Sequence, residues 1–82
     1  MSWTVYHDHV LGVLPSLPAA SVHCVVTSPP YWGLRRYLPE GHPNADKCIG
    51  LEPTVEQWVT RLVEVFRAVR RVLRDDGVCW VN

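Results

Sequence analysis

The chain has 82 residues, of which 48% are hydrophobic, and its eight basic side chains balance eight acidic ones. This length suits one compact domain, and the neutral net charge excludes a cationic nucleic-acid-binding surface over the whole chain, so any such contact must be local. No apolar run approaches the roughly 20 residues that span a bilayer. The N-terminus also lacks the basic-then-apolar layout of a secretory signal, so a cytoplasmic location without membrane contact is expected.

The cysteine pattern excludes two further classes of protein. Cys24, Cys48 and Cys79 are odd in number and widely spaced, and no CxxC is present. This argues against both a disulfide framework and a structural zinc site. No metal site is therefore expected.

The N-terminal third of the chain alternates between strand and helix patterns. Trp3–His7 and Val22–Val26 are short, rich in β-branched or aromatic residues and bounded by breakers, so both are predicted to be strands. The segment between them carries a short helical stripe of Val and Leu, which Gly12 and Pro15 weaken. A brief or bent helix is expected there.

A second helix is predicted more clearly in the C-terminal half. Thr54 followed by Gln57 gives the S/T-x-x-E/Q pattern of a capping box, which marks a helix start. Apolar residues then recur at steps of three and four over about five turns, which predicts one buried helix face. Gly77 is expected to supply a left-handed stop, after which residues 78–82 resume a strand pattern.

The order strand, helix, strand, long loop, helix, strand predicts an α/β fold with three parallel strands and two right-handed crossover helices. Trp58 and Trp80 are expected in its core. The chain is expected to form a single incomplete domain, residues 1–82, because nothing after the last strand covers the sheet and parallel sheets need both faces covered. A missing C-terminal half or self-association is therefore predicted.

The segment from Ser28 to Pro53 is a long connection without clear periodicity. Connections of this length in compact domains are usually functional or disordered. This one begins at the carboxyl end of a predicted buried strand, which is where open α/β sheets place their ligands. The start of the segment is therefore the candidate functional site.

The residues at that start suit a planar ligand that bears an amino group. Pro29 and Pro30 fix two φ angles and remove two N–H donors, which leaves a stiff segment rich in acceptors. Ser28 adds a side-chain acceptor, and Tyr31 and Trp32 add flat aromatic faces. A nucleobase, with hydrogen-bond donors on its edge and a stacking face, fits this description.

The stretch "TSPPYW" resembles the [DNS]-P-P-[YFW] motif of DNA methyltransferases that methylate an exocyclic amino nitrogen. The Ser-first form is typical of enzymes that make N4-methylcytosine. The preceding "YHDHVLGVLPSLPAASVHCVV" and the following "WGLRRY" and "IGLEPTVEQWV" are similar to flanking segments of the same group, so the resemblance covers essentially the whole chain. It implies a partial Rossmann-like methyltransferase fold of the permuted type, with this motif near the N-terminus.

The resemblance also implies a reaction and its residues. The methyl group of S-adenosylmethionine would pass to the N4 of a cytosine flipped out of double-stranded DNA. Ser28 and the Pro29 carbonyl would accept the amino N–H bonds, and Tyr31 would stack on the base. Pro30 completes the catalytic motif.

On the cofactor side the resemblance points to Asp8, which falls where the family has an Asp that contacts adenosine. His7 stands where the family usually has Gly, and the residues alone equally suit Asp8 as a helix cap for a segment starting at His9. The family's FxGxG loop and a target-recognition region are absent from these residues. The chain alone is therefore expected neither to bind S-adenosylmethionine tightly nor to turn over.

Two alternatives remain open at this point. The same acceptor pair would serve the N6 amino group of adenine, since Ser at the first motif position is only a tendency. A non-catalytic remnant that binds DNA or a partner subunit is the alternative outside the enzyme class.

Overall fold

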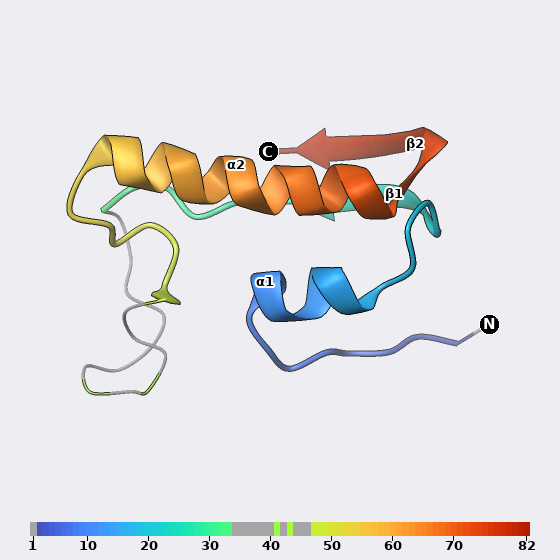
Figure 1. Ribbon diagram of the computed structural model, residues 1–82, viewed down its shortest axis with the longest axis horizontal. Helices are drawn as coiled ribbons and strands as arrows, with labels where there is room; N and C mark the ends of the chain where they lie inside the picture. Colours follow the sequence, from blue (N-terminus) through green and yellow to red (C-terminus); the bar gives the residue numbers. More distant parts are fainter. Residues whose placement is uncertain (1, 34–40, 42, 44–46) are drawn as a thin grey trace.

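The computed structural model describes residues 2–33, 41, 43 and 47–82 (Figure 1). Along the chain it contains a short helix, a 3-10 turn, a strand, a long helix and a second strand. These elements are α1 (Val10–Val13), η1 (Leu14–Ser16), β1 (Val22–Thr27), α2 (Val55–Val72) and β2 (Leu73–Val81). The long helix α2 contacts both α1 and β2 and so connects the two halves of the fold. No described helix is long and apolar enough to cross a membrane.

The two strands pair in parallel, with α2 as the crossover between them. Cys24, Val25, Val26 and Thr27 lie opposite four consecutive residues of β2, from Val78 to Val81. The Val22–Val26 segment and the C-terminal segment are therefore both strands and run parallel, as in an α/β fold. Because the strands are parallel, their carboxyl ends lie at the same edge of the sheet.

The expectation of three parallel strands was wrong. Trp3–His7 forms no strand, and the described sheet has two strands. This segment is drawn apart from β1 and β2 in Figure 1, and 85% of the Trp3 surface is exposed. The physical reason is that an alternating pattern favours extended backbone, whereas a strand also needs a neighbour to complete its hydrogen-bond ladder.

The predicted brief helix is present and bends as its breakers require. α1 is four residues long and passes into η1, which has a Pro among its first two residues. His9 is the N-cap, and its Nδ1 accepts a hydrogen bond from the Leu11 N–H at 3.1 Å. The side chain of His9 is therefore the cap, a role that the residues alone had suggested as an alternative for Asp8.

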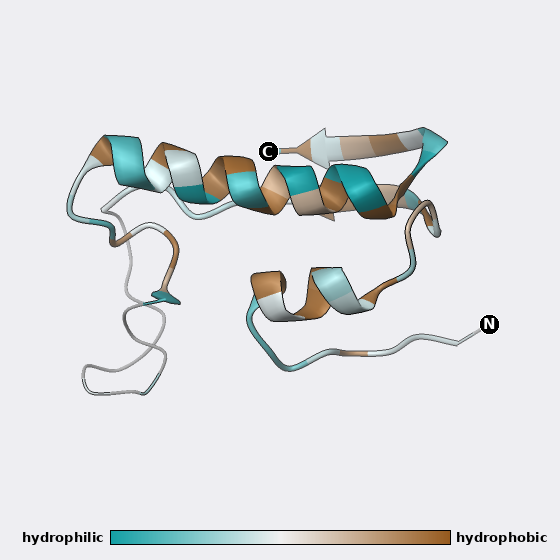
Figure 2. Cartoon of the chain, in the orientation of Figure 1, coloured by the Kyte–Doolittle hydropathy of each residue, from teal (hydrophilic) through white to brown (hydrophobic). Residues whose placement is uncertain are grey.

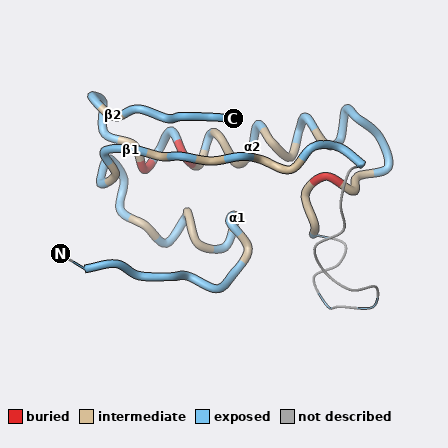
Figure 3. The backbone as a smooth tube through the Cα atoms, turned by 180° about the vertical axis from the view of Figure 1, so that it is seen from behind, coloured by how far each residue is buried: buried red, intermediate tan, exposed pale blue. Residues whose placement is uncertain are grey.

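Helix α2 begins as predicted, because the Thr54 hydroxyl accepts a hydrogen bond from the Gln57 N–H at 3.2 Å. Its apolar and polar residues alternate along the ribbon in Figure 2. The buried apolar residues of the described chain are Val69, which is 7% exposed, and Val72, which is 1% exposed. Both lie in the second half of α2, and Figure 3 shows the small extent of this core.

Gly77 does not end α2 as expected. The helix ends at Val72, and Leu73 adopts an extended conformation with φ −71° and ψ 139° because it pairs with Val22. Gly77 lies within β2 at a crowded point. A Cβ added there would be 3.0 Å from the Arg74 carbonyl oxygen and 3.1 Å from that of His23.

One face of the sheet is apolar and exposed. Cys24 and Val26 alternate with inward residues on β1 and lie opposite Val78 and Trp80, so these four share a face. Trp80 is 67% exposed and Val26 78% exposed, so the expectation that Trp80 lies in the core was wrong. In the described chain, α2 packs on the other side of the strands, and Trp80 has no layer to pack against.

Arg71 joins α2 to the N-terminal half of the chain. Its Nη2 donates to the carbonyl oxygens of Leu14, Pro15 and Leu17 at 2.9, 3.3 and 2.6 Å. These carbonyls lie at the end of the α1–η1 segment, where the helix dipole also favours a cation.

We expect Arg71→Ala to lower the free energy of unfolding by about 1 kcal/mol, because these carbonyls lose a charged donor at a solvent-exposed site. Chemical denaturation measures this loss. Arg70→Ala is the matched control, since Arg70 is also exposed and donates to no carbonyl of the described residues, and it should change stability by less than about 0.5 kcal/mol. Equal losses in the two variants would contradict the assigned role of Arg71.

Candidate functional site

The Ser28–Tyr31 segment begins at the carboxyl edge of the sheet. β1 ends at Thr27, and the Thr27 carbonyl oxygen accepts a hydrogen bond from the Asn82 N–H at 3.0 Å. The last pairing of the two strands therefore lies immediately before Ser28. Ser28 thus follows the carboxyl end of a parallel strand, as expected, but no residue of β1 is buried, so the expectation of a buried strand was wrong.

The oxygen atoms of Ser28, Pro29 and Pro30 at this edge differ in whether they accept a hydrogen bond. Ser28 is exposed, and Pro29 and Pro30 are half-buried. Within the described part of the chain, neither Ser28 Oγ nor the Pro29 oxygen accepts a hydrogen bond, whereas the Pro30 oxygen accepts one from Trp58 Nε1 at 3.2 Å. Tyr31 follows with 59% of its surface exposed. Among the described residues, the segment thus presents two acceptors without a donor, followed by an accessible aromatic ring.

A second segment, residues 49–58, holds this edge in place. Trp32 Nε1 donates to the Glu52 carbonyl oxygen at 2.9 Å, and the Gly33 N–H donates to the Gly50 carbonyl. Together with the Trp58 bond to Pro30, three hydrogen bonds tie the aromatic segment to the approach of α2. Sequence reasoning treated Trp58 as core and did not identify Gly50 or Glu52.

Gly50 occupies a position that only glycine suits. It is buried, its φ is +108°, and a Cβ added there would lie 2.9 Å from the Tyr31 carbonyl oxygen. The Gly50 N–H donates to both carboxylate oxygens of Glu52, at 3.2 and 2.9 Å. The sequence signal was a Gly within the apolar stretch Ile49–Leu51, but nothing in that pattern identifies Tyr31 as its neighbour.

Asp8 is engaged within its own turn. Its Oδ1 accepts a hydrogen bond from the His9 N–H at 2.7 Å, and its Oδ2 lies 3.1 Å from the position of a Cβ on Gly12. The carboxylate is exposed, and Oδ2 accepts no hydrogen bond from a described residue. None of the described hydrogen bonds joins Asp8 to Ser28–Tyr31.

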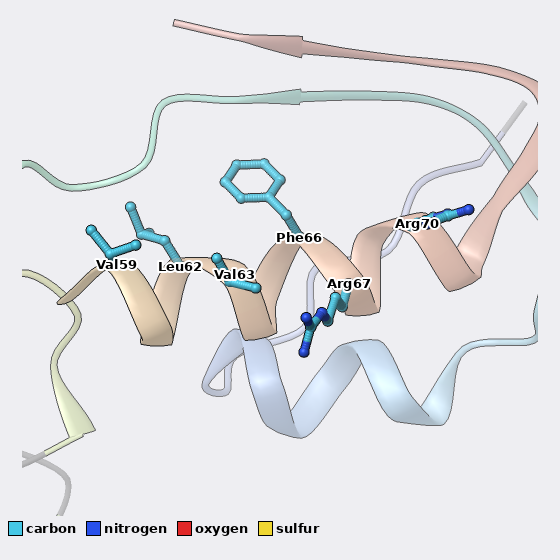
Figure 4. A pocket seen from close by; sticks show the side chains of 6 residues that line it. All are labelled: Val59, Leu62, Val63, Phe66, Arg67 and Arg70. Carbon is cyan, nitrogen blue, oxygen red and sulfur yellow. The ribbon is translucent and has the colours of Figure 1, made fainter. Parts of the chain in front are cut away.

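A shallow apolar hollow of about 390 Å³ lies on α2 (Figure 4). In Figure 4, Leu62 and Phe66 project from one side of the helix and Arg67 from the other. The complete lining is Val59, Leu62, Val63, Phe66, Arg67 and Arg70. It contains no carboxylate, thiol or hydroxyl group and none of the predicted site residues, so the candidate site is the strand edge rather than this hollow.

The described residues bring together no group of three or more His, Cys, Asp or Glu side chains that could hold a metal ion. Cys24, Cys48 and Cys79 are all free thiols. The chemistry available at the strand edge is therefore that of hydroxyl and carbonyl acceptors and of aromatic faces.

Residues 22–82, from the first residue of β1 to the end of the chain, match the family described as "DNA methylase". The chain belongs to this DNA methylase family. The match includes both strands, α2 and the whole Ser28–Tyr31 segment. Membership implies in general that S-adenosylmethionine is the methyl donor.

The named relatives that this chain resembles are also methyltransferases. The chain is 49% identical over 79 residues to "Type II methyltransferase M.Cfr9I" of Citrobacter freundii and 51% identical over 79 residues to "Type II methyltransferase M.XycI" of Xanthomonas campestris pv. cyanopsidis. Each alignment covers 96% of this chain and 24% of the relative. The DNA methylase chain thus spans about a quarter of the length of these relatives. No solved structure matches it.

Proposed function

We propose that this chain carries the target-base half of a Type II DNA methyltransferase that transfers a methyl group from S-adenosylmethionine to the exocyclic N4 of cytosine. The substrate is double-stranded DNA with the target base flipped out of the stack. The observation that carries the proposal is the strand edge, where Ser28 Oγ and the Pro29 oxygen accept no hydrogen bond from a described residue and the exposed Tyr31 follows in the same short segment.

The acceptors have a specific task in this reaction. An exocyclic amino nitrogen is a poor nucleophile because its lone pair is conjugated into the ring. Hydrogen bonds from its two N–H groups to Ser28 Oγ and the Pro29 oxygen favour a more tetrahedral nitrogen with an available lone pair. The rate is then gained from positioning and from preorganised dipoles, without a covalent intermediate on the protein.

Tyr31 positions the base, and Pro30 positions the backbone that carries the acceptors. Stacking on the Tyr31 ring offsets the few kcal/mol that base flipping costs. Pro30 fixes the backbone between the Pro29 acceptor and the Tyr31 ring, and its own carbonyl is already engaged by Trp58. The amino nitrogen would take the methyl group while the sulfur of the donor leaves as a neutral thioether. One amino proton would pass to water during or after this step, since Ser28 is too weak a base to remove it first.

Asp8 is the proposed contact for the adenosine part of S-adenosylmethionine. A carboxylate suits ribose hydroxyls, and the Asp8 carboxylate is exposed with one oxygen free of described partners. When bound, S-adenosylmethionine supplies an electrophilic methyl group. Asp8 orients the donor in this proposal and takes no part in proton transfer.

The test is methylation of DNA by the protein at its full encoded length, with tritiated S-adenosylmethionine and mass spectrometry of the product nucleosides. N4-methylcytosine is the expected product. If N6-methyladenine forms instead, the target base is adenine, and the same acceptors serve its amino group. If no methylated nucleoside forms while DNA binding is retained, the protein is a non-catalytic DNA-binding protein and the proposed function is wrong.

A further inference from the structure

The strand edge depends on a segment that lies more than fifteen residues further along the chain. Gly50, Glu52 and Trp58 each contact the Tyr31 neighbourhood, and each contact involves a different backbone or ring group. We propose that these three residues, the support set, are positioning residues that fix the Ser28–Tyr31 acceptors for methyl transfer. This inference rests on the proposed function and adds residues that the motif itself does not contain.

Trp58 fixes the backbone on one side of the acceptor pair. Its indole N–H donates to the Pro30 oxygen at 3.2 Å, and the ring is half-buried on the first turn of α2. The peptide bonds before Pro29 and before Pro30 carry no N–H, so neither can donate a hydrogen bond that would hold the segment in place. The Trp58 N–H holds the next peptide plane, that of the Pro30–Tyr31 bond, and leaves the Pro29 oxygen to accept a substrate N–H.

Gly50 and Glu52 fix the aromatic side of the edge. The absence of a Cβ on Gly50 allows the Tyr31 carbonyl to approach, because a Cβ would be only 2.9 Å away. The Glu52 carboxylate accepts a hydrogen bond from the Gly50 N–H. The backbone carbonyl oxygen of Glu52 accepts another from Trp32 Nε1 at 2.9 Å, which orients the Trp32 ring. Gly50 and Glu52, two residues apart, thus fix the positions of both Tyr31 and Trp32.

The support set acts on geometry rather than on ligand contact, so its removal should lower kcat and leave KM for DNA and for S-adenosylmethionine nearly unchanged. In the protein at its full encoded length, Trp58→Phe keeps an aromatic ring and removes the donor, and kcat should fall about tenfold. Gly50→Ala forces the Tyr31 carbonyl to move and should lower kcat roughly 100-fold. Val59→Ala, on an exposed position of the same helix, is the control and should change neither constant.

Two further measurements separate positioning from a general loss of stability. Glu52→Gln keeps an oxygen acceptor for the Gly50 N–H, so it should recover most of the kcat that Glu52→Ala loses. Hydrogen exchange followed by mass spectrometry should show faster exchange in the peptide 27–33 of Gly50→Ala, where the Gly33 N–H is bonded to Gly50. The α2 peptides should exchange as in the wild type.

The outcomes distinguish this inference from the proposed function. If the wild type transfers no methyl group, the proposed function fails, and the exchange of peptide 27–33 alone decides whether the support set holds the edge. Unchanged kcat and unchanged exchange in Trp58→Phe and Gly50→Ala would overturn the inference. So would a rise in KM for DNA at constant kcat, since the residues would then act in binding.

Discussion

Substituting Ser28 with alanine should lower kcat for DNA methylation about 100-fold, because removal of one preorganised hydrogen-bonding group costs about this much in comparable sites. Ser28 Oγ is exposed at the carboxyl end of β1 and accepts no hydrogen bond from the described residues, so its free acceptor is available to the amino group of the base. Steady-state methylation of a cytosine-containing duplex at the full encoded length measures the effect. KM for DNA should change little.

Ser16→Ala is the matched control for this substitution. The Ser16 hydroxyl of η1 donates to the carbonyl oxygen of Val13, the last residue of α1, at 2.6 Å, away from the strand edge. This variant should keep the wild-type kcat. If Ser28→Ala behaved as Ser16→Ala does, Ser28 could not be an acceptor in the reaction, and the Pro29 oxygen would have to act without it.

Replacing Val72 with alanine should lower the free energy of unfolding by about 2 kcal/mol, the largest stability effect expected for a single truncation in this chain. Val72 is 1% exposed and is the most completely buried side chain of the described residues. For a domain of this size such a loss lowers Tm by roughly 8 to 16 °C. Differential scanning calorimetry measures it.

Val59→Ala serves as the control, since the same chemical change is made on the same helix at a position that is 47% exposed. The lost burial is small there, and alanine has the better helix propensity, so the change should stay within about 0.5 kcal/mol. A similar loss at both positions would show that helix propensity, rather than the core around Val72, determines the stability of α2.

Local signals in the sequence predicted the elements that local chemistry determines. The Thr54 cap and the apolar periodicity located the start of α2, and Pro15 located the bend after α1. The order of the elements predicted a parallel sheet, and the two described strands are parallel. The strand at Trp3–His7 was wrong because its pattern contains no information on whether a neighbouring strand exists to pair with it.

The candidate site was only half visible in the sequence. The prolines and aromatic residues after Thr27 identified the strand edge because their chemistry is unusual at that point of an α/β fold. Gly50 and Glu52 entered only as part of a flanking segment of the resemblance and were given no role at the site, since their contacts are with residues about twenty positions away. Gly77 was predicted to end the helix. It lies instead in β2, where the absence of a Cβ allows β1 to approach closely.

The irregular start of the sheet gives β2 a place where its length can change. Between Val22 and Cys24 on β1 the chain advances two residues, while on β2 it advances five, from Leu73 to Val78. The surplus residues lie outside the regular ladder, so an insertion or deletion among them would be absorbed locally without shifting the pairing from Val78 onward. Homologous chains that differ in length between Leu73 and Val78 can therefore keep the same strand edge intact.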